Sequence, residues 1–207
     1  MNREEKNRLT REQIVSAAVE EFGMHSYSEA SLNEISKRGG LSKGIIYHYF
    51  KDKDELYLVC VRACFTSLLD FLGGIEFTLS RVEESMEKYL SSRQEFFKEN
   101  PYYSTIFTNA LLQPPKHLKD EIKDITAELE SFNVAFYERI LDHVELKEDV
   151  TRQEAVDYFM LFQESFNHHF QKQTYEDIGQ LFQEHELKLK RFLKLVFHGI
   201  VKEELDK

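Results

Sequence analysis

The 207-residue sequence has few of the residues that interrupt a chain. It contains no tryptophan, three prolines and eight glycines, and beyond residue 74 the glycines are Gly179 and Gly199. Hairpins and βαβ connections depend on such turn residues, so their scarcity over the last two thirds argues against a sheet. Hydrophobic residues are 42% of the chain and aromatic residues 13%, which is ample for a core. The sequence therefore predicts an all-α protein.

Long apolar runs and cysteines are also scarce. The start, MNREEKNRLTREQ, is charged, unlike a signal peptide, and no segment approaches the ~18 consecutive apolar residues of a membrane span. We therefore expect a cytoplasmic protein with no membrane partner. Cys60 and Cys64 stand one helical turn apart in an apolar stretch. This spacing favours buried free thiols over a disulfide or a metal site.

The negative charge is concentrated in the C-terminal part. The net charge is -10, yet residues 1–55 carry 9 Lys or Arg and 10 Asp or Glu, which leaves 18 and 27 for the rest. A nucleic acid would be repelled by the acidic part. A DNA contact is therefore tolerable only in the N-terminal segment, and only where its basic groups converge on one face.

Capping patterns locate the starts of several helices. A Ser, Thr or Asp followed three residues later by Glu or Gln can satisfy free backbone N–H groups at a helix start. Such pairs are Thr10 with Gln13, Ser31 with Glu34, Asp52 with Glu55, and Thr151 with Glu154. With glycine and proline as stops, the pattern predicts about nine helices. Their approximate ranges are 10–24, 31–38, 42–48, 52–72, 77–99, 101–112, 116–144, 151–171 and 175–204.

The segment SLNEISKRGGLSKGIIYHYF, residues 31–50, has the pattern of a helix-turn-helix. Ile35 and Leu41 would pack the two helices together, and a second helix of about seven residues fits a major groove ~12 Å wide. Ser31 begins the first helix and is itself a candidate DNA-binding residue, and the second helix exposes residues of the kinds that contact phosphate and bases. These are Ser42, Lys43, Gly44, Ile45, Tyr47 and His48. Ile45 could meet a thymine methyl or pack against the protein, and both readings stay open.

The stretch SKGIIYHYFKDKDEL resembles the hallmark of the TetR family of bacterial transcriptional regulators. The matching positions are Ser42, Lys43, Gly44, Tyr47, Tyr49, Phe50, Lys53, Asp54 and Leu56, with Ile14, Ala17, Ala18, Phe22 and Ile35 upstream. The resemblance covers about residues 10–60. It implies that Ser42, Lys43, Gly44, Tyr47 and His48 line the DNA interface and that Lys53 holds a phosphate. Lys53 also stands at an expected helix N-terminus, which favours an anion independently.

The resemblance further implies a helix-turn-helix domain over residues 1–55 and a helical ligand-binding and dimerisation domain over 56–207. In such proteins the middle helices enclose a small-molecule pocket, and here the aromatic residues suit a largely apolar effector. Candidate pocket residues are Tyr103, Phe107, Asn109, Phe132, Phe136, Phe162, Gln163 and Phe166. The apolar stripe of the last helix is a candidate dimer interface, formed by Leu189, Phe192, Leu193, Val196 and Ile200.

An enzyme is the rival class, but the sequence shows no catalytic constellation. His168 and His169 are adjacent, hence about 100° apart on a helix, and cannot both reach one metal ion easily. We expect no catalytic residues, metal or cofactor. The sequence favours a ligand-responsive repressor that binds a palindromic double-stranded DNA operator as a homodimer. A helix-turn-helix regulator without an effector, or a helical enzyme, remains the alternative.

Overall fold

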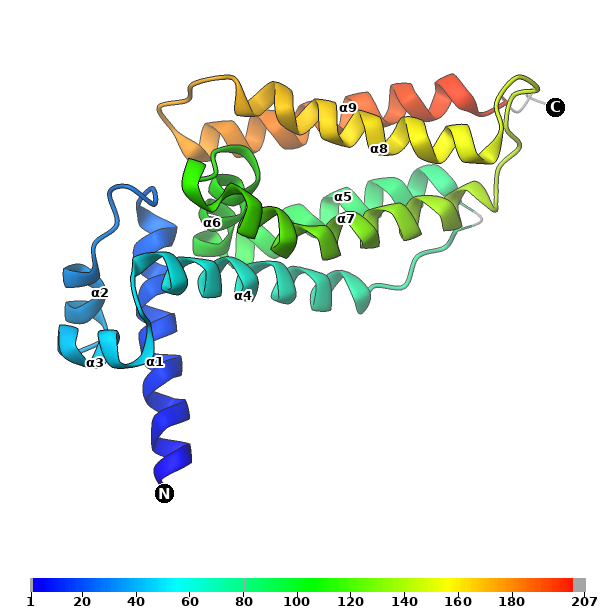
Figure 1. Cartoon of the computed structure of the whole chain (residues 1–207). Helices are drawn as coiled ribbons and strands as arrows, with labels where there is room; N and C mark the ends of the chain where they lie inside the picture. The colour runs from blue at the N-terminus through cyan, green and yellow to red at the C-terminus, as the bar shows by residue number, and fades with distance from the viewer. Residues whose placement is uncertain (1, 80, 203–207) are drawn as a thin grey trace. The chain divides into compact units, whose positions relative to one another are not determined.

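The computed structural model of the chain describes residues 2–79 and 81–202. These residues form nine α-helices and one short 3-10 helix, with no strand, which confirms the all-α prediction (Figure 1). The helices are α1 (Arg3–Met24), α2 (Leu32–Arg38), α3 (Lys43–Tyr49), α4 (Lys53–Gly73), α5 (Val82–Glu99), α6 (Pro101–Leu112), η1 (Lys116–Leu118), α7 (Lys119–Leu141), α8 (Arg152–Gln171) and α9 (Ile178–Ile200).

The first helix begins seven residues earlier than the capping pattern predicts. Asn2 caps α1 by accepting from the Glu5 amide at 2.7 Å, whereas the Thr10 hydroxyl donates to the Lys6 carbonyl within the helix. Thr10 and Gln13 therefore form no capping box, and the charged start is helical. The expected box of Thr151 and Glu154 is present at α8.

The other helix ends differ by smaller amounts. The expected helix 116–144 is divided in the structure. A 3-10 turn, η1, follows Pro115 directly, and α7 begins after it and ends at Leu141. At the C-terminal end, Val201 leaves the helix and bridges Leu146, which stops α9 at Ile200. Residues 203 and 204 of the expected last helix lie outside the described residues.

Two compact units divide the chain. Unit 1 comprises Met1–Ser67 and Phe97–Thr126, and unit 2 comprises Leu68–Phe96 and Ala127–Lys207. Three helices, α4, α5 and α7, contribute residues to both units. Unit 1 thus joins the helix-turn-helix to α6, a helix far along the chain.

In unit 1, α6 packs directly on α1. A Cβ added at Gly23 would stand 2.4 Å from the Tyr102 Cβ, so the absence of a side chain at this position allows the close approach. Buried apolar side chains from α1, α2, α3, α4 and the α3–α4 connection complete the core around the helix-turn-helix. They include Ile14, Phe22, Ile35, Ile46, Phe50 and Leu56.

Within the described residues, one helix, α4, has the length and hydropathy of a membrane span. Its apolar side chains, such as Leu56, Val61 and Phe65, are at most 1% exposed, as expected for the core helix of a folded unit. Cys60 and Cys64 lie among them as free, buried thiols, which confirms the reading of that pair. Burial raises the pKa of both thiols, so neither is disposed to react as a thiolate.

Candidate nucleic-acid interface

The turn between α2 and α3 follows from two adjacent glycines. Gly39 ends α2, and Gly40 adopts φ 59°, a left-handed conformation that side-chain-bearing residues rarely adopt. Across the turn, the Ser36 hydroxyl donates to the Leu41 carbonyl at 2.5 Å. Ser42 then caps α3 by accepting from the Ile45 amide. The sequence thus builds a compact helix-turn-helix.

Glu21 fixes this motif to α1, a role that the sequence did not reveal. Its carboxylate is 1% exposed and accepts from the Ser31 amide at 3.0 Å and from the Arg38 Nε at 3.2 Å. Ser31 itself caps α2 through its hydroxyl. The neighbouring Glu20 is half-buried and lies 3.7 Å from an Arg38 guanidinium nitrogen, so only the three-dimensional contacts distinguish the role of Glu21 from that of Glu20.

Helix α3 turns one face inward and leaves the predicted DNA-contacting residues outward. Ile46 is 1% exposed, whereas Ser42, Lys43, Gly44, Tyr47 and His48 are all exposed. Ile45 is also exposed, at 37%, which favours the groove-facing reading over packing against the protein. A Cβ at Gly44 would meet just the Ser42 Oγ, at 3.8 Å, so the fold itself does not require glycine there.

Lys53 is engaged within the protein rather than free. Its ammonium donates to the Tyr27 carbonyl at 2.8 Å and to the Ala30 carbonyl at 3.2 Å, and lies 4.3 Å from the Tyr27 ring centroid. An ammonium has three N–H donors, so one remains for a phosphate. Lys53 therefore holds the α1–α2 connection in place, a structural role that the sequence reading did not include.

A polar cluster ties this connection to α4 and η1. The Tyr27 hydroxyl donates to one Asp54 oxygen, and His117 Nε2 stands 3.3 Å from the other. Burial and the Asp54 carboxylate raise the pKa of Tyr27, while the Tyr27 hydrogen bond, assisted by His117, lowers the pKa of Asp54. The carboxylate is therefore ionised and the phenol neutral at physiological pH.

The predicted pocket residues are divided between the two units. Tyr103, Phe107 and Asn109 belong to unit 1, where Phe107 lies 5.2 Å from Phe65 and 4.7 Å from Phe97 between ring centroids. Phe107 and Asn109 are buried there. The remaining five lie in unit 2 and form two groups. Phe132 and Phe136 flank Tyr89 of α5, and Phe162 and Phe166 of α8, with Gln163 between them in sequence, lie near Phe192 of α9.

Unit 2 also contains a buried polar network that the sequence did not reveal. Arg93 of α5 and Glu186 of α9 form an ion pair of 2.7 Å, with side chains 5% and 2% exposed. His185 Nδ1 lies 3.1 Å from the same Glu186 Oε1, and His185 Nε2 lies 3.1 Å from Asn167 of α8. Among the described atoms, Glu186 Oε2 is buried with no hydrogen-bond partner.

The pKa values of this pair follow from competing effects. Burial alone would raise the pKa of Glu186, but Arg93 and His185 outweigh burial and hold that pKa below its usual value. Burial opposes the charge on Arg93 as well, and Glu186 compensates and raises the pKa of the guanidinium. Both groups are therefore charged, and each stabilises the charge on the other.

The predicted dimer stripe on α9 faces mainly into its own unit. Leu189, Leu193 and Ile200 are 7%, 8% and 6% exposed, and Val196 is half-buried, which leaves little of them for a partner chain. Phe192 is the exposed member of the stripe. Other large apolar side chains of unit 2 are outward-facing instead. They are Tyr158, Met160 and Leu161 on α8 and Leu187 and Leu195 on α9.

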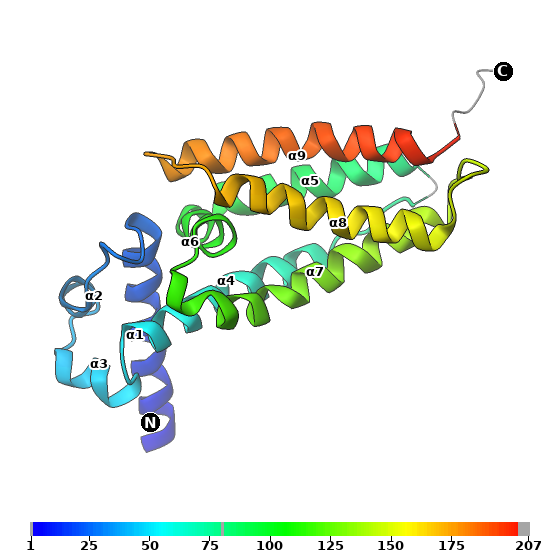
Figure 2. The same ribbon diagram turned by 45° about the horizontal axis from the view of Figure 1, so that its top comes forward.

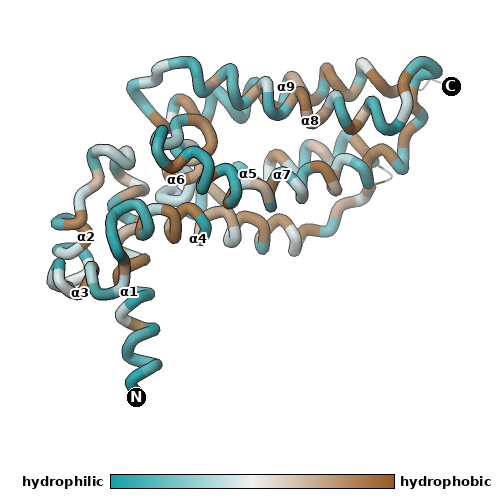
Figure 3. The backbone as a smooth tube through the Cα atoms, in the orientation of Figure 1, coloured by the Kyte–Doolittle hydropathy of each residue, from teal (hydrophilic) through white to brown (hydrophobic). Residues whose placement is uncertain are grey.

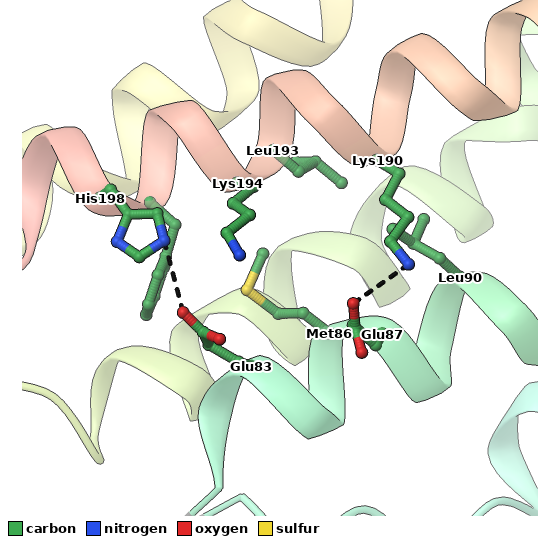
Figure 4. Close-up of a pocket in the computed structure, with 9 residues that line it drawn as sticks. Glu83, Met86, Glu87, Leu90, Lys190, Leu193, Lys194 and His198 are labelled. Atoms are coloured by element: carbon green, nitrogen blue, oxygen red, sulfur yellow. Dashed lines mark ion pairs between the residues drawn. The ribbon is translucent and has the colours of Figure 1, made fainter.

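A cleft lies between α5 and α9, and Leu193 faces into it. Leu193 and Phe197 line it together with Met86 and Leu90, and it holds about 410 Å³ of empty space, solvent at its mouth included (Figure 4). Two ion pairs span it, Lys190–Glu87 at 3.1 Å and His198–Glu83 at 3.3 Å. None of the eight predicted pocket residues lines this cleft.

No metal centre emerges from residues 2–79 and 81–202, since no three His, Cys, Asp or Glu side chains there are grouped to hold an ion. His168 and His169 are both exposed on α8. His169 Nε2 lies 2.6 Å from the Gln173 side chain, an ordinary surface contact within one turn.

Two family models match the chain. The model described as bacterial regulatory proteins, tetR family, matches residues 14–60, and the model of the tetracyclin repressor-like C-terminal domain matches residues 80–202. The first match contains all of α2 and α3. The second contains α5 to α9, including every residue of the buried polar network.

Individual proteins are similar over different lengths. The transcriptional activator FasR of Mycolicibacterium smegmatis is 29% identical over 118 residues, which are 53% of this chain and 52% of FasR, so the match spans about half its length. A putative tetR family regulator from Shewanella shares the fold with a TM-score of 0.61 at 15% identity, over 94% of this chain and 99% of that one. FadR of Bacillus subtilis, solved in complex with stearoyl-CoA, has a TM-score of 0.54 at 18% identity, over 86% and 97%.

Proposed function

We propose that this chain, which belongs to the tetR family of bacterial transcriptional regulators, represses transcription as a homodimer bound to a palindromic operator and responds to a small-molecule effector. The observation that carries the proposal is the outward face of α3. Its exposed hydroxyl, ammonium and aromatic groups surround a glycine that the fold itself does not require. We assign DNA binding to residues 1–55 and ligand binding and dimerisation to residues 56–207, with the protein acting in the cytoplasm and no enzymatic activity.

Selection of bound DNA from a random pool tests the DNA-binding proposal directly. One seven-residue recognition helix reads few bases, so two copies related by a two-fold axis should contact half-sites about one DNA turn, ~34 to 36 Å, apart or somewhat more. An enriched palindrome is the expected result. A reporter placed behind that sequence then measures the direction of regulation, because FasR is named as an activator and supports the opposite sign.

Alanine at Lys43 or Tyr47 should weaken operator binding and leave the fold intact. Both side chains are exposed on α3, so each replacement removes a DNA contact without opening the core. We expect roughly 5- to 150-fold weaker binding for each, the usual range for a contact that reads or positions a base. Fluorescence anisotropy measures the affinity and thermal melting measures the stability.

Lys53→Ala is the informative contrast. Because the Lys53 ammonium also binds the Tyr27 and Ala30 carbonyls, this variant should lose stability as well as its proposed phosphate contact. Loss of that contact lowers the slope of log affinity against log salt by about 0.9. If Lys43→Ala and Tyr47→Ala both bind like the parent at moderate salt, α3 is not the recognition helix.

The dimer is proposed to form through the outward faces of α8 and α9. These neighbouring helices expose Tyr158 and Leu161 on one and Leu187, Phe192 and Leu195 on the other. Exposed apolar side chains gathered on adjacent elements are typical of an interface. The proposed interface therefore retains Phe192 of the sequence-based set and replaces its buried members.

The effector is proposed to bind in unit 2, among Phe132, Phe136, Phe162, Gln163 and Phe166. These aromatic groups suit an apolar body, and the buried Glu186 Oε2 could accept from one donor group of a ligand. FadR, with stearoyl-CoA bound, supports a long apolar ligand in a protein of this fold. Tyr103, Phe107 and Asn109 fit a core role in unit 1 better.

Native mass spectrometry of the purified protein tests the effector. We expect a small molecule that co-purifies and whose addition lowers operator affinity about 5- to 150-fold, the range of typical coupling energies. By reciprocity, operator should weaken effector binding by the same factor. Equal effector affinity for free and operator-bound protein contradicts the coupling, since equal binding cannot shift a population.

A further inference from the structure

The first two turns of α1 pack against almost nothing in the protein. Residues 2–9 are all exposed, whereas core packing begins at Ile14. The segment is nevertheless helical from Arg3, with Asn2 as its cap, and both views show it extending beyond α3 (Figures 1 and 2). Apart from Leu9, which is 43% exposed, its residues are hydrophilic (Figure 3). A capped helical extension without a core role needs another explanation.

Two contacts align this extension with the end of the recognition helix. The Tyr49 hydroxyl donates to Asn7 Oδ1 at 3.1 Å, and the Arg11 guanidinium lies 5.1 Å from the Phe50 ring centroid. Asn7 and Arg11 are one helical turn apart, so one face of α1 runs along the C-terminal end of α3. Arg3 lies about 6 Å further along the axis and about 40° around it from Asn7, on the side away from Arg11, whereas Glu4 lies about 20° from Arg11.

The charges of the extension are segregated around the helix. At about 100° per residue, Arg3 and Lys6 lie about 60° apart, on the same side as Thr10. The acids are at least about 100° from either cation, and they are Glu4, Glu5 and Glu12. Arg8, on the acidic side, pairs with Glu12 at 2.8 Å. The extension therefore presents one basic side free of acids, in a chain whose net charge is -10.

We propose that Arg3 and Lys6 bind DNA phosphates that flank the bases contacted by α3, an inference that rests on the proposed DNA-binding function. DNA carries about one negative charge per 1.7 Å of its axis, so a helix that extends beyond the recognition helix along the duplex meets phosphates. Asn7 acts as a positioning residue, because its contact with Tyr49 fixes the extension relative to α3. The DNA backbone contacted by each subunit thereby extends past the bases that α3 contacts.

Salt dependence of operator binding tests this contact. Arg3→Ala and Lys6→Ala should each lower the slope of log affinity against log salt by about 0.9, and the double variant by about 1.8. Between 50 and 200 mM salt the parent should then lose about twelvefold more affinity than the double variant. The base preference should not change, because phosphate contacts carry no sequence information. Circular dichroism checks that helicity is retained.

Arg8→Ala is the matched control, since it removes the same charge from the acidic side of the same two turns. Its slope should equal that of the parent. Unchanged slopes for Arg3→Ala and Lys6→Ala, in a protein that binds its selected operator, overturn this inference and leave the proposed function standing. An equal loss in Arg8→Ala also overturns it, because net charge would then explain the effect. If the parent selects no DNA at all, the proposed function fails first.

Discussion

Glu186→Gln should lower the free energy of unfolding by about 3 to 5 kcal/mol at neutral pH, because it leaves the buried Arg93 guanidinium without a counter-charge. Glutamine keeps the size and shape of the side chain, so the effect reports charge rather than a cavity. Urea unfolding followed by circular dichroism, at matched protein concentration, measures it. The expected loss is a large part of the 5 to 15 kcal/mol that stabilises a typical protein.

Glu87→Gln provides the matched control. The Lys190–Glu87 pair joins the same two helices, α5 and α9, but its side chains are 52% and 66% exposed, so removing it should change stability little. The double variant Arg93→Met with Glu186→Leu should recover most of the loss, since a buried ion pair is often replaceable by apolar residues. A Glu186→Gln variant as stable as Glu87→Gln would contradict the importance of the buried pair.

The pH dependence of the same variant has a definite sign. The pKa of Glu186 is lowered in the folded protein, so its contribution to stability is present above the unfolded pKa, about 4.3. That contribution is lost as the pH falls through the folded pKa. The difference in stability between parent and Glu186→Gln should therefore be largest near pH 7 and shrink below about pH 4.

Leu161→Glu combined with Leu195→Glu should convert the proposed dimer into a folded monomer and abolish specific operator binding. These leucines are 61% and 67% exposed, so carboxylates there are solvated in the monomer but would be buried in the proposed interface. A monomer contacts one half-site, and we expect affinity to fall about 10³-fold or more, toward the non-specific level. Sedimentation velocity gives the mass and anisotropy the affinity.

Two further variants separate the interface from the core. Leu193→Glu places a charge at a position only 8% exposed beside Met86 and Leu90, so it should unfold unit 2 rather than release a folded monomer. Leu9→Glu, on the exposed part of α1, should stay dimeric. A double variant that still sediments as a dimer would remove the α8–α9 face from consideration.

The sequence alone determined the all-helical fold class and the helix-turn-helix of α2 and α3. Helix formation depends on the scarcity of turn residues, on the helical spacing of apolar side chains and on local caps. These signals act within one or two helical turns, so they can be recognised without knowledge of the fold. The order Ser42, Lys43, Gly44, Tyr47 is similarly local, because a single short helix presents all four residues outward. The start of α1 was misread because its cap is Asn2, with Glu5 three residues later, rather than one of the Ser, Thr or Asp residues from which a start was predicted.

Tertiary structure decided which side of each C-terminal helix is buried. On α9 most apolar residues lie on one side of the helix, but periodicity could not tell whether that side met α5 of the same chain or a second chain; Leu193 packs toward α5, and Leu195, off that side, is exposed. The partners of Glu21, Lys53 and Glu186 were equally hidden. Pairings such as Arg93 with Glu186, 93 residues apart, arise from packing between helices and leave no periodic signal in the sequence. Local interactions determine which segments form helices, and long-range packing determines which side of each helix is buried.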